Sequence, residues 1–235
     1  MDTQAATPAE SRPVWAAIVL AGGGSERLGT DKTQVRVGGC TALDRVLAAV
    51  QSTHAPPMAV LGVGAGRPTD RPVRWVREEP PGSGPACGVV AALTALDRGE
   101  SGNSGTTGTP PQVAVAVAVV LAGDLPMLSS GLIDRLVDAV PPLERADGVR
   151  LVDADGRPQH LLGAYRLEAL RRSAGARDDW AGASMRALLA PLTLLDLAPM
   201  ATETLDLLDL DTPADVQAAR SRLRAAQPRQ PDEER

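Results

Sequence analysis

Residues 14–32, which read VWAAIVLAGGGSERLGTDK, decide the fold of this chain. The first seven of them, 14–20, form a continuous apolar run with the length of a buried strand. The glycines at 22–24 then rule out a regular element, because glycine clusters interrupt both helices and strands. Residues 41–50 follow with apolar side chains at helical spacing. Strand, glycine-rich loop and helix in this order predict the first unit of an α/β sheet.

The next hundred residues continue the alternation of strands and helices. Residues 58–63 and 73–76 predict strands, and residues 85–96 predict a helix. Residues 113–122 are apolar on both faces, which is typical of a strand in the middle of a parallel sheet covered by helices. A further helix is expected to begin near Ser130.

The second half of the chain is less regular. Its expected elements are a hairpin of 149–153 with 161–164, short helices at 167–172 and 183–189, and strands at 192–197 and 205–210. Thr212, Pro213 and Asp215 are typical of a helix start and predict a closing helix. We predict one α/β domain over residues 13–225, with an inserted or appended region after about residue 145. Residues 1–12 and 226–235 are expected to be disordered, and the low-complexity loop at about 99–112 to be mobile.

Composition excludes several classes of protein. The chain has 235 residues and a formal net charge of −5, which argues against a nucleic-acid-coating protein but leaves room for a small phosphorylated ligand. It has no apolar run of about 18 residues, so no membrane span is expected. Residues 1–13 do not have the pattern of a secretory signal. The two cysteines, Cys40 and Cys87, match neither a disulfide framework nor a zinc site, and we expect a cytoplasmic protein.

Two of the predicted strands end in residues suited to phosphate chemistry. Gly22, Gly23 and Gly24 let successive backbone N–H groups form an anion-binding concavity at the end of the first strand. Lys32, which follows closely, is the single lysine among 24 basic residues. Asp124 comes directly after the central strand, where a carboxylate can hold Mg²⁺. Ligands of open parallel sheets bind at these carboxyl ends.

The loop fits neither the P-loop nor the dinucleotide-binding pattern, because its glycines and Lys32 have the wrong spacing for both. It does fill every fixed position of L-A-G-G-x-S-x-R-[ML]-G-x-D-K, and in this it resembles the MobA-like family of molybdenum cofactor guanylyltransferases. Five later segments are similar to further segments of that family in the same order: 78–88, 121–126, 156–165, 182–188 and 211–216.

The resemblance implies a three-layer, Rossmann-like nucleotidyltransferase fold with a mostly parallel sheet. It also implies Mg²⁺-dependent transfer of GMP from GTP to molybdopterin, with release of pyrophosphate. The residues it points to for nucleotide binding are Leu20, Ala21, Gly22, Gly23, Gly24, Ser25, Lys32, Gly62, Glu79 and Asp124. Arg27, Lys32 and Asp124 are the implied catalytic residues, and Asp124 is also the implied metal ligand.

The chain departs from the family at the positions expected to contact the base or the ribose. The family usually has Asn near Gly62 and Asp at Glu79, and Gly123 replaces a frequent Cys. These departures leave the choice of nucleobase open. A cytidylyltransferase, an enzyme with another phosphorylated acceptor and a non-catalytic nucleotide-binding regulator therefore stay as alternatives.

Several polar residues have two interpretations from the sequence. Asp124 could cap the helix near Ser130, Glu79 could be a solvated charge, and Asp211 could be a second metal ligand or part of a helix start. The remaining candidates are interpreted as packed or surface residues: His160, Tyr165 and Trp180, and the cluster of Arg171, Arg172 and Arg177, which an anionic pterin could use.

Overall fold

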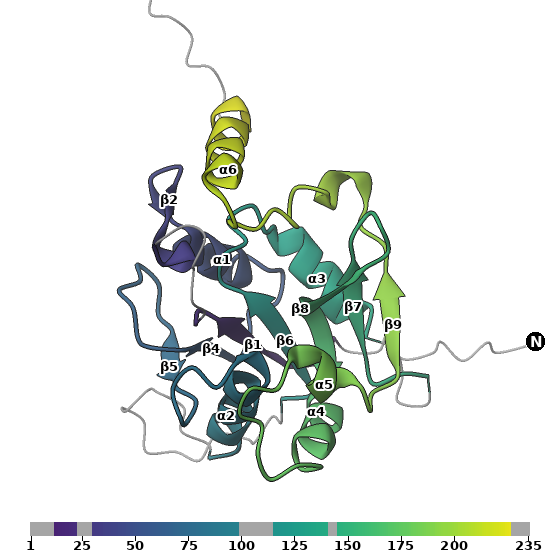
Figure 1. Ribbon diagram of the computed structural model, residues 1–235. Helices are drawn as coiled ribbons and strands as arrows, with labels where there is room; N and C mark the ends of the chain where they lie inside the picture. The colour runs from purple at the N-terminus through teal and green to yellow at the C-terminus, as the bar shows by residue number, and fades with distance from the viewer. Residues whose placement is uncertain (1–11, 23–29, 99–114, 141–144, 227–235) are drawn as a thin grey trace, which may run out of the picture.

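The computed structural model describes residues 12–22, 30–98, 115–140 and 145–226, and Figure 1 shows their arrangement. The loop at 99–112 and nearly all of the two ends expected to be disordered lie outside these ranges. Arg12 lies inside them, where its guanidinium forms ion pairs with Asp134 and Asp138 at 2.6 and 2.8 Å.

A seven-stranded sheet forms the middle layer, in the order β5–β4–β1–β6–β8–β7–β9. The strand β8 is antiparallel to both of its neighbours, and the other four strand pairs in the sheet are parallel. The central position belongs to β6, as its two apolar faces predicted. The strands are β1 (Trp15–Leu20), β4 (Ala59–Val63), β5 (Arg74–Val76), β6 (Val117–Ala122), β7 (Gly148–Val152), β8 (Pro158–Arg166) and β9 (Leu194–Leu197).

Helices cover both faces of this sheet (Figure 1). One face packs against α1 (Ala42–Gln51) and α3 (Ser130–Asp138), and the other against α2 (Pro85–Asp97), α4 (Leu167–Ala174) and α5 (Met185–Leu189). Side chains of a strand alternate between faces, and β1 is apolar at every position. Its odd-numbered residues join the α1–α3 core and its even-numbered residues from Ile18 onward join the other core. The predicted three-layer α/β fold is confirmed.

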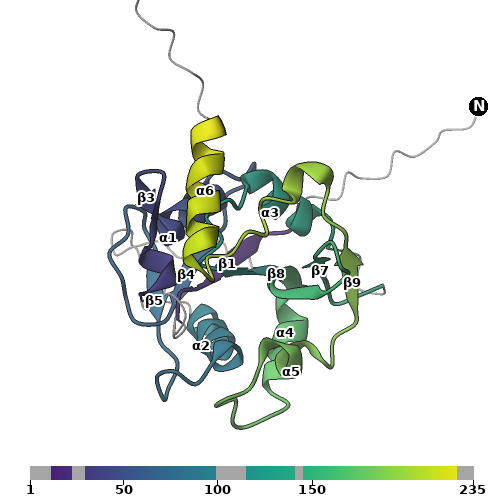
Figure 2. The same cartoon turned by 45° about the horizontal axis from the view of Figure 1, so that its top comes forward.

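A small third core lies outside these layers. The 3-10 helix η1 (Lys32–Gln34) and the hairpin of β2 (Arg36–Val37) with β3 (Cys40–Thr41) precede α1. The closing helix α6 (Pro213–Ala226) packs on this hairpin through Val37, Leu210 and Val216, and Figure 2 shows α6 beside β3 and α1. The expected start of α6 is confirmed, since Thr212 and Asp215 cap each other's backbone N–H groups.

Two expectations for the second half are wrong. Residues after 145 are not an appended region, because β7, β8 and β9 extend the same sheet. Residues 205–210 form turns rather than a strand, and a second 3-10 helix, η2 (Ala201–Glu203), precedes them. In this segment Leu205 is 39% exposed, whereas Asp206 is only 3% exposed. The Asp206 carboxylate is buried because it accepts a hydrogen bond from the backbone N–H of Ser129.

Candidate active site

Three segments that are far apart in the sequence meet at the carboxyl ends of β1 and β6. The Nζ atom of Lys32, on η1, donates a hydrogen bond to Oδ1 of Asp211 and lies 4.0 Å from Oδ2 of Asp124. Asp124 lies in the turn that follows β6, and Asp211 lies two residues before α6. The Lys32 and Asp124 side chains are 24% and 22% exposed, so their charged groups face solvent and can reach a ligand. The structure thus brings together two predicted catalytic residues and adds Asp211 to them.

The position of Lys32 depends on the residue before it. Asp31 caps η1, because its Oδ1 atom accepts hydrogen bonds from the backbone N–H and the hydroxyl of Thr33 at 3.1 and 2.7 Å. The Nε atom of Arg67, which follows β4, donates a hydrogen bond to the other oxygen of Asp31. Arg67 therefore adds a cation near the glycine-rich loop. No local pattern in the sequence marks an arginine in that connection as a functional residue.

Asp124 is held at the end of β6 by contacts with β1 and α1. The N–H of Gly123 donates to the carbonyl of Leu20 at 2.9 Å, and Nε of Arg45 donates to the carbonyl of Pro126 at 2.6 Å. Asp124 does not cap α3, since Ser129 is the cap residue and accepts from the N–H of Leu132. Burial raises the pKa of the Asp124 carboxyl above its ordinary value; nearby Lys32 lowers it in part, and Asp211 raises it further.

A cleft of about 220 Å³ opens beside Asp124. It is bounded by the start of β8 and by Asp209, which the sequence analysis had placed in a strand. Desolvation and then the negative charges of Asp211 and Asp124 raise the pKa of Asp209, so the three carboxylates act on one another. The lining residues are Ala122, Asp124, Leu125, Gln159, His160, Leu161, Leu162, Leu207 and Asp209.

The first part of the glycine-rich loop lies at the same edge of the sheet. The N–H of Ala21 donates to the carbonyl of Val63 at 2.9 Å, which continues the pairing of β1 with β4 beyond Leu20. Gly22 then passes close to Gly64, where a Cβ atom would lie 3.1 Å from the Gly22 nitrogen. Gly64 has a φ of +131°, which side chains rarely allow. Of the other predicted loop residues, Gly23, Gly24, Ser25 and Arg27 lie outside the described ranges.

Comparison with known families decides the classification. The profile of the MobA-like NTP transferase domain matches residues 17–195. The chain belongs to this family. A "probable molybdenum cofactor guanylyltransferase" of Chloroflexus aggregans is 31% identical over 223 residues, which cover 88% of this chain and 93% of that protein.

Solved structures agree on the fold of this MobA-like transferase. Molybdopterin-guanine dinucleotide biosynthesis protein A from Archaeoglobus fulgidus superposes with a TM-score of 0.64 at 17% identity, covering 89% of this chain and 99% of that one. The 2-C-methyl-D-erythritol 4-phosphate cytidylyltransferase from Thermus thermophilus gives 0.56 at 17% identity, covering 88% and 98%. At these identities the two structures support the fold alone.

The structure explains one departure from the family pattern, at Gly62, and shows the surroundings of another, Glu79. Gly62 lies in β4, where a Cβ atom would come within 2.8 Å of the Trp75 ring. The ring therefore occupies the space that a side chain would need, and only the Gly62 backbone can face a ligand. Glu79 is exposed. Its neighbour Glu78 is buried, and Oε1 of Glu78 accepts a hydrogen bond from the N–H of Gly82 at 3.0 Å.

The arginine cluster of the second half is engaged by other side chains of the protein. Arg171 pairs with Asp97 and Glu168, and Arg172 pairs with Asp147. The guanidinium of Arg177 lies 4.9 Å from the ring centre of Trp180. The interpretation as a surface cluster fits these contacts. Tyr165 and Trp180 are 0% and 5% exposed, so both are packed, as expected.

The carboxylates beside Lys32 have the chemistry that Mg²⁺ requires. In the part of the chain that the structure describes, no three His, Cys, Asp or Glu side chains are placed to enclose a metal ion. Mg²⁺ does not need such an enclosure, because it usually binds one or two carboxylates together with water and substrate phosphates. Asp124 and Asp211 supply oxygen donors on either side of Lys32, so the site fits the ion. Within the same ranges, no helix has the length and apolar character to cross a membrane.

Proposed function

We propose that this MobA-like transferase moves GMP from GTP to the phosphate group of molybdopterin, in a Mg²⁺-dependent reaction that releases pyrophosphate. The observation that supports the chemistry is the placement of Lys32 between Asp124 and Asp211 at the carboxyl ends of β1 and β6. The choice of GTP and molybdopterin is supported by the name of the relative that matches 88% of the chain.

In the proposed reaction, a phosphate oxygen of the acceptor attacks the α-phosphorus of GTP. A new phosphoanhydride bond forms as the bond between the α-phosphorus and the bridging oxygen to the β-phosphate breaks. Pyrophosphate leaves with that electron pair, and no covalent link to the protein is needed. Both reactants are anions, so the site has to neutralise negative charge that crowds around the α-phosphorus in the transition state.

Lys32 is already positioned for this task before a ligand arrives. Its ammonium is held by Asp211 and lies 4.0 Å from Asp124, so little reorganisation is needed when phosphate oxygens approach. Asp124 and Asp211 would hold Mg²⁺, which neutralises phosphate charge when it is bound. The backbone at Ala21 and Gly22, fixed by pairing with Val63 and by the close approach of Gly64, would face the nucleotide.

A second candidate function is transfer of CMP, to molybdopterin or to another phosphorylated acceptor. Two observations favour keeping it: the Trp75 ring fills the space beside Gly62, and Glu79 stands where the family usually has Asp. Neither change touches Lys32 or Asp124. They would alter the recognition of the base and leave the chemistry at the α-phosphorus in place.

Release of pyrophosphate from each of GTP, CTP, ATP and UTP, with Mg²⁺ and purified molybdopterin, tests the proposal. We expect release with GTP, and its loss in Asp124→Asn. Asp155→Asn is the matched control, because Asp155 is 69% exposed on the β7–β8 turn, where it pairs only with Arg157. Release with CTP alone would support the second candidate. Tight binding of a nucleotide without turnover would reject molybdopterin as the acceptor, and would indicate another phosphorylated acceptor or a regulatory protein.

A further inference from the structure

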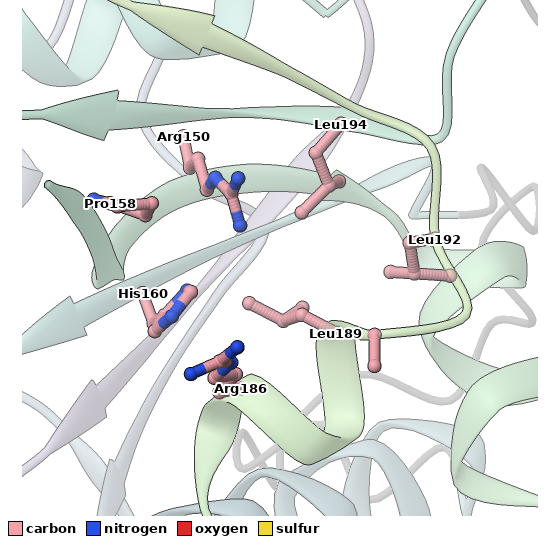
Figure 3. Close-up of a pocket in the computed structure, with 8 residues that line it drawn as sticks. Arg150, Pro158, His160, Arg186, Leu189, Leu192 and Leu194 are labelled. Atoms are coloured by element: carbon pink, nitrogen blue, oxygen red, sulfur yellow. The ribbon is translucent and has the colours of Figure 1, made fainter. Parts of the chain in front are cut away.

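A second hollow, of about 530 Å³, adjoins the Asp124 cleft on the α5 side of the sheet (Figure 3). Its floor and walls combine positive and apolar side chains from β7, β8, α5 and β9. Organic ligands that bear an anionic group typically bind in hollows of this kind. The lining residues are Arg150, Pro158, His160, Arg186, Leu189, Ala190, Leu192 and Leu194.

The two arginines of this hollow, Arg150 and Arg186, converge with the His160 imidazole, as Figure 3 shows. Burial and then the charges of Arg150 and Arg186 lower the pKa of His160. Arg150 is partly neutralised, because its Nε atom lies 2.7 Å from Oδ1 of Asp196. Arg186 is exposed and forms no ion pair with any described side chain. The hollow therefore has excess positive charge that the protein itself does not neutralise.

His160 lies between the two hollows and lines both of them. Its Nδ1 atom is buried and has no hydrogen-bond partner among the described residues. A buried polar atom without a partner is costly, so it marks a place where a ligand group is expected to bind.

An irregularity in β8 produces this placement. The pairing of β7 with β8 shifts between Arg150 and Leu151, whose partners are Gly163 and Gln159, so the residues between those partners bulge from the ladder. The Tyr165 hydroxyl donates to the His160 carbonyl at 3.1 Å and fixes the bulge. Gly163 is required there, since a Cβ atom would lie 2.5 Å from that hydroxyl oxygen. Bulges beside binding sites commonly redirect one side chain in this way.

We propose that Arg150, His160 and Arg186 form the acceptor subsite of this enzyme, and that they bind a phosphate monoester whose organic body packs against Leu189, Leu192 and Leu194. This inference rests on the proposed function, because it names the site of the second substrate. Arginine favours phosphate oxygens through charge-assisted hydrogen bonds. The shared wall at His160 places the subsite next to the cleft that Asp124 lines.

Steady-state kinetics of Arg186→Gln test the subsite. Loss of a hydrogen bond to a charged group predicts an increase in the KM for molybdopterin of about 10- to 100-fold, with the KM for GTP unchanged within about twofold. Arg186→Lys keeps the charge and is expected to recover part of the loss. Arg157→Gln is the matched control, because Arg157 is a cation on the β7–β8 turn that is 75% exposed and pairs with Asp155.

A binding measurement without turnover separates this inference from the proposed function. The chain has only two histidines, so the imidazole NMR signals of His54 and His160 can be distinguished with one substitution. We expect inorganic phosphate to shift the His160 signals in the wild-type protein and to do so more weakly in Arg186→Gln. A wild-type enzyme that transfers GMP, with an unchanged molybdopterin KM in Arg186→Gln and a silent His160, would overturn the subsite alone. A His160 response without nucleotidyl transfer would reject the proposed function and support the anion site.

Discussion

Replacement of Lys32 by alanine tests the central element of the site. The variant removes the ammonium that donates a hydrogen bond to Asp211 and lies 4.0 Å from Oδ2 of Asp124. The fold should tolerate the change, because ion pairs with this degree of exposure contribute about 0–1 kcal/mol to stability. The expected effect is therefore on the reaction and not on folding.

Its magnitude follows from the geometry. A phosphate oxygen about 4 Å from the Lys32 ammonium would interact with it by roughly 4 kcal/mol at an effective dielectric constant near 20. Removal of one preorganised group that stabilises developing negative charge costs about 2.7–4 kcal/mol in well-studied enzymes. A loss near 3 kcal/mol corresponds to about 10²-fold in kcat/KM. Lys32→Arg restores the charge but replaces a compact ammonium with a broad guanidinium, so its activity should fall between the wild type and Lys32→Ala.

The assay is pyrophosphate release at varied GTP and fixed molybdopterin, alongside a thermal melt to confirm that each variant is folded. A folded Lys32→Ala enzyme with kcat/KM within about threefold of the wild type would refute the reasoning. Arg157 is an exposed cation distant from these carboxylates in the sequence. If Arg157→Gln lost as much kcat/KM as Lys32→Ala, the reasoning would also be refuted, because the loss would then follow from the net charge of the protein.

Three further predictions concern the scaffold. Gly62→Asn introduces the residue type usual in the family, yet the 2.8 Å approach of its Cβ to the Trp75 ring should cost about 1–3 kcal/mol in urea denaturation; an unchanged midpoint would show that the ring moves aside. Tyr165→Phe removes the hydrogen bond to the His160 carbonyl and should cost about 1 kcal/mol while raising the KM for the acceptor and not for GTP. Burial favours a higher pKa for Asp134, but hydrogen bonds from Arg12 and His54 outweigh it and lower the pKa below its ordinary value. The stability that this carboxylate contributes is therefore present above about pH 4, and is lost as the pH falls through the lower pKa of Asp134 in the folded protein. Asp134→Asn should flatten the dependence of the unfolding free energy on pH in that range.

The first half of the fold could be predicted because its signals are local. The apolar run of β1, the glycine-rich loop and the start of α1 each depend on neighbouring residues, and Thr41 caps α1 by accepting from the N–H of Asp44, as its place in the sequence suggests. The same holds for Asp124, which directly follows an unmistakable central strand. Local sequence patterns were thus enough to predict where β1 and β6 end and to identify Lys32 and Asp124 as the residues expected to act there.

The segment before α6 could not be predicted in this way, because distant partners decide its conformation. The Glu203 carboxylate binds Arg135 of α3 through both oxygens, and the Asp206 carboxylate accepts from the N–H of Ser129. These contacts bury two acidic side chains, and the residues expected to form a strand at 205–210 do not form one. The segment that these contacts hold also brings Asp209 to the cleft, a placement that no local pattern indicates.

The antiparallel direction of β8 explains why the first residues of this strand, and not its last, lie beside the site. A parallel strand beside β6 would bring its last residues to the carboxyl edge of the sheet, and its first residues would lie at the opposite edge. Because β8 is antiparallel, Leu162 pairs with Leu121 and Arg166 with Val117, so the start of β8 lies at the functional edge. The bulge in that start then turns His160 toward both hollows. A hairpin can be expected from its turn residues, but the position of a bulge depends on how Tyr165 packs over Gly163, which no spacing in the sequence specifies.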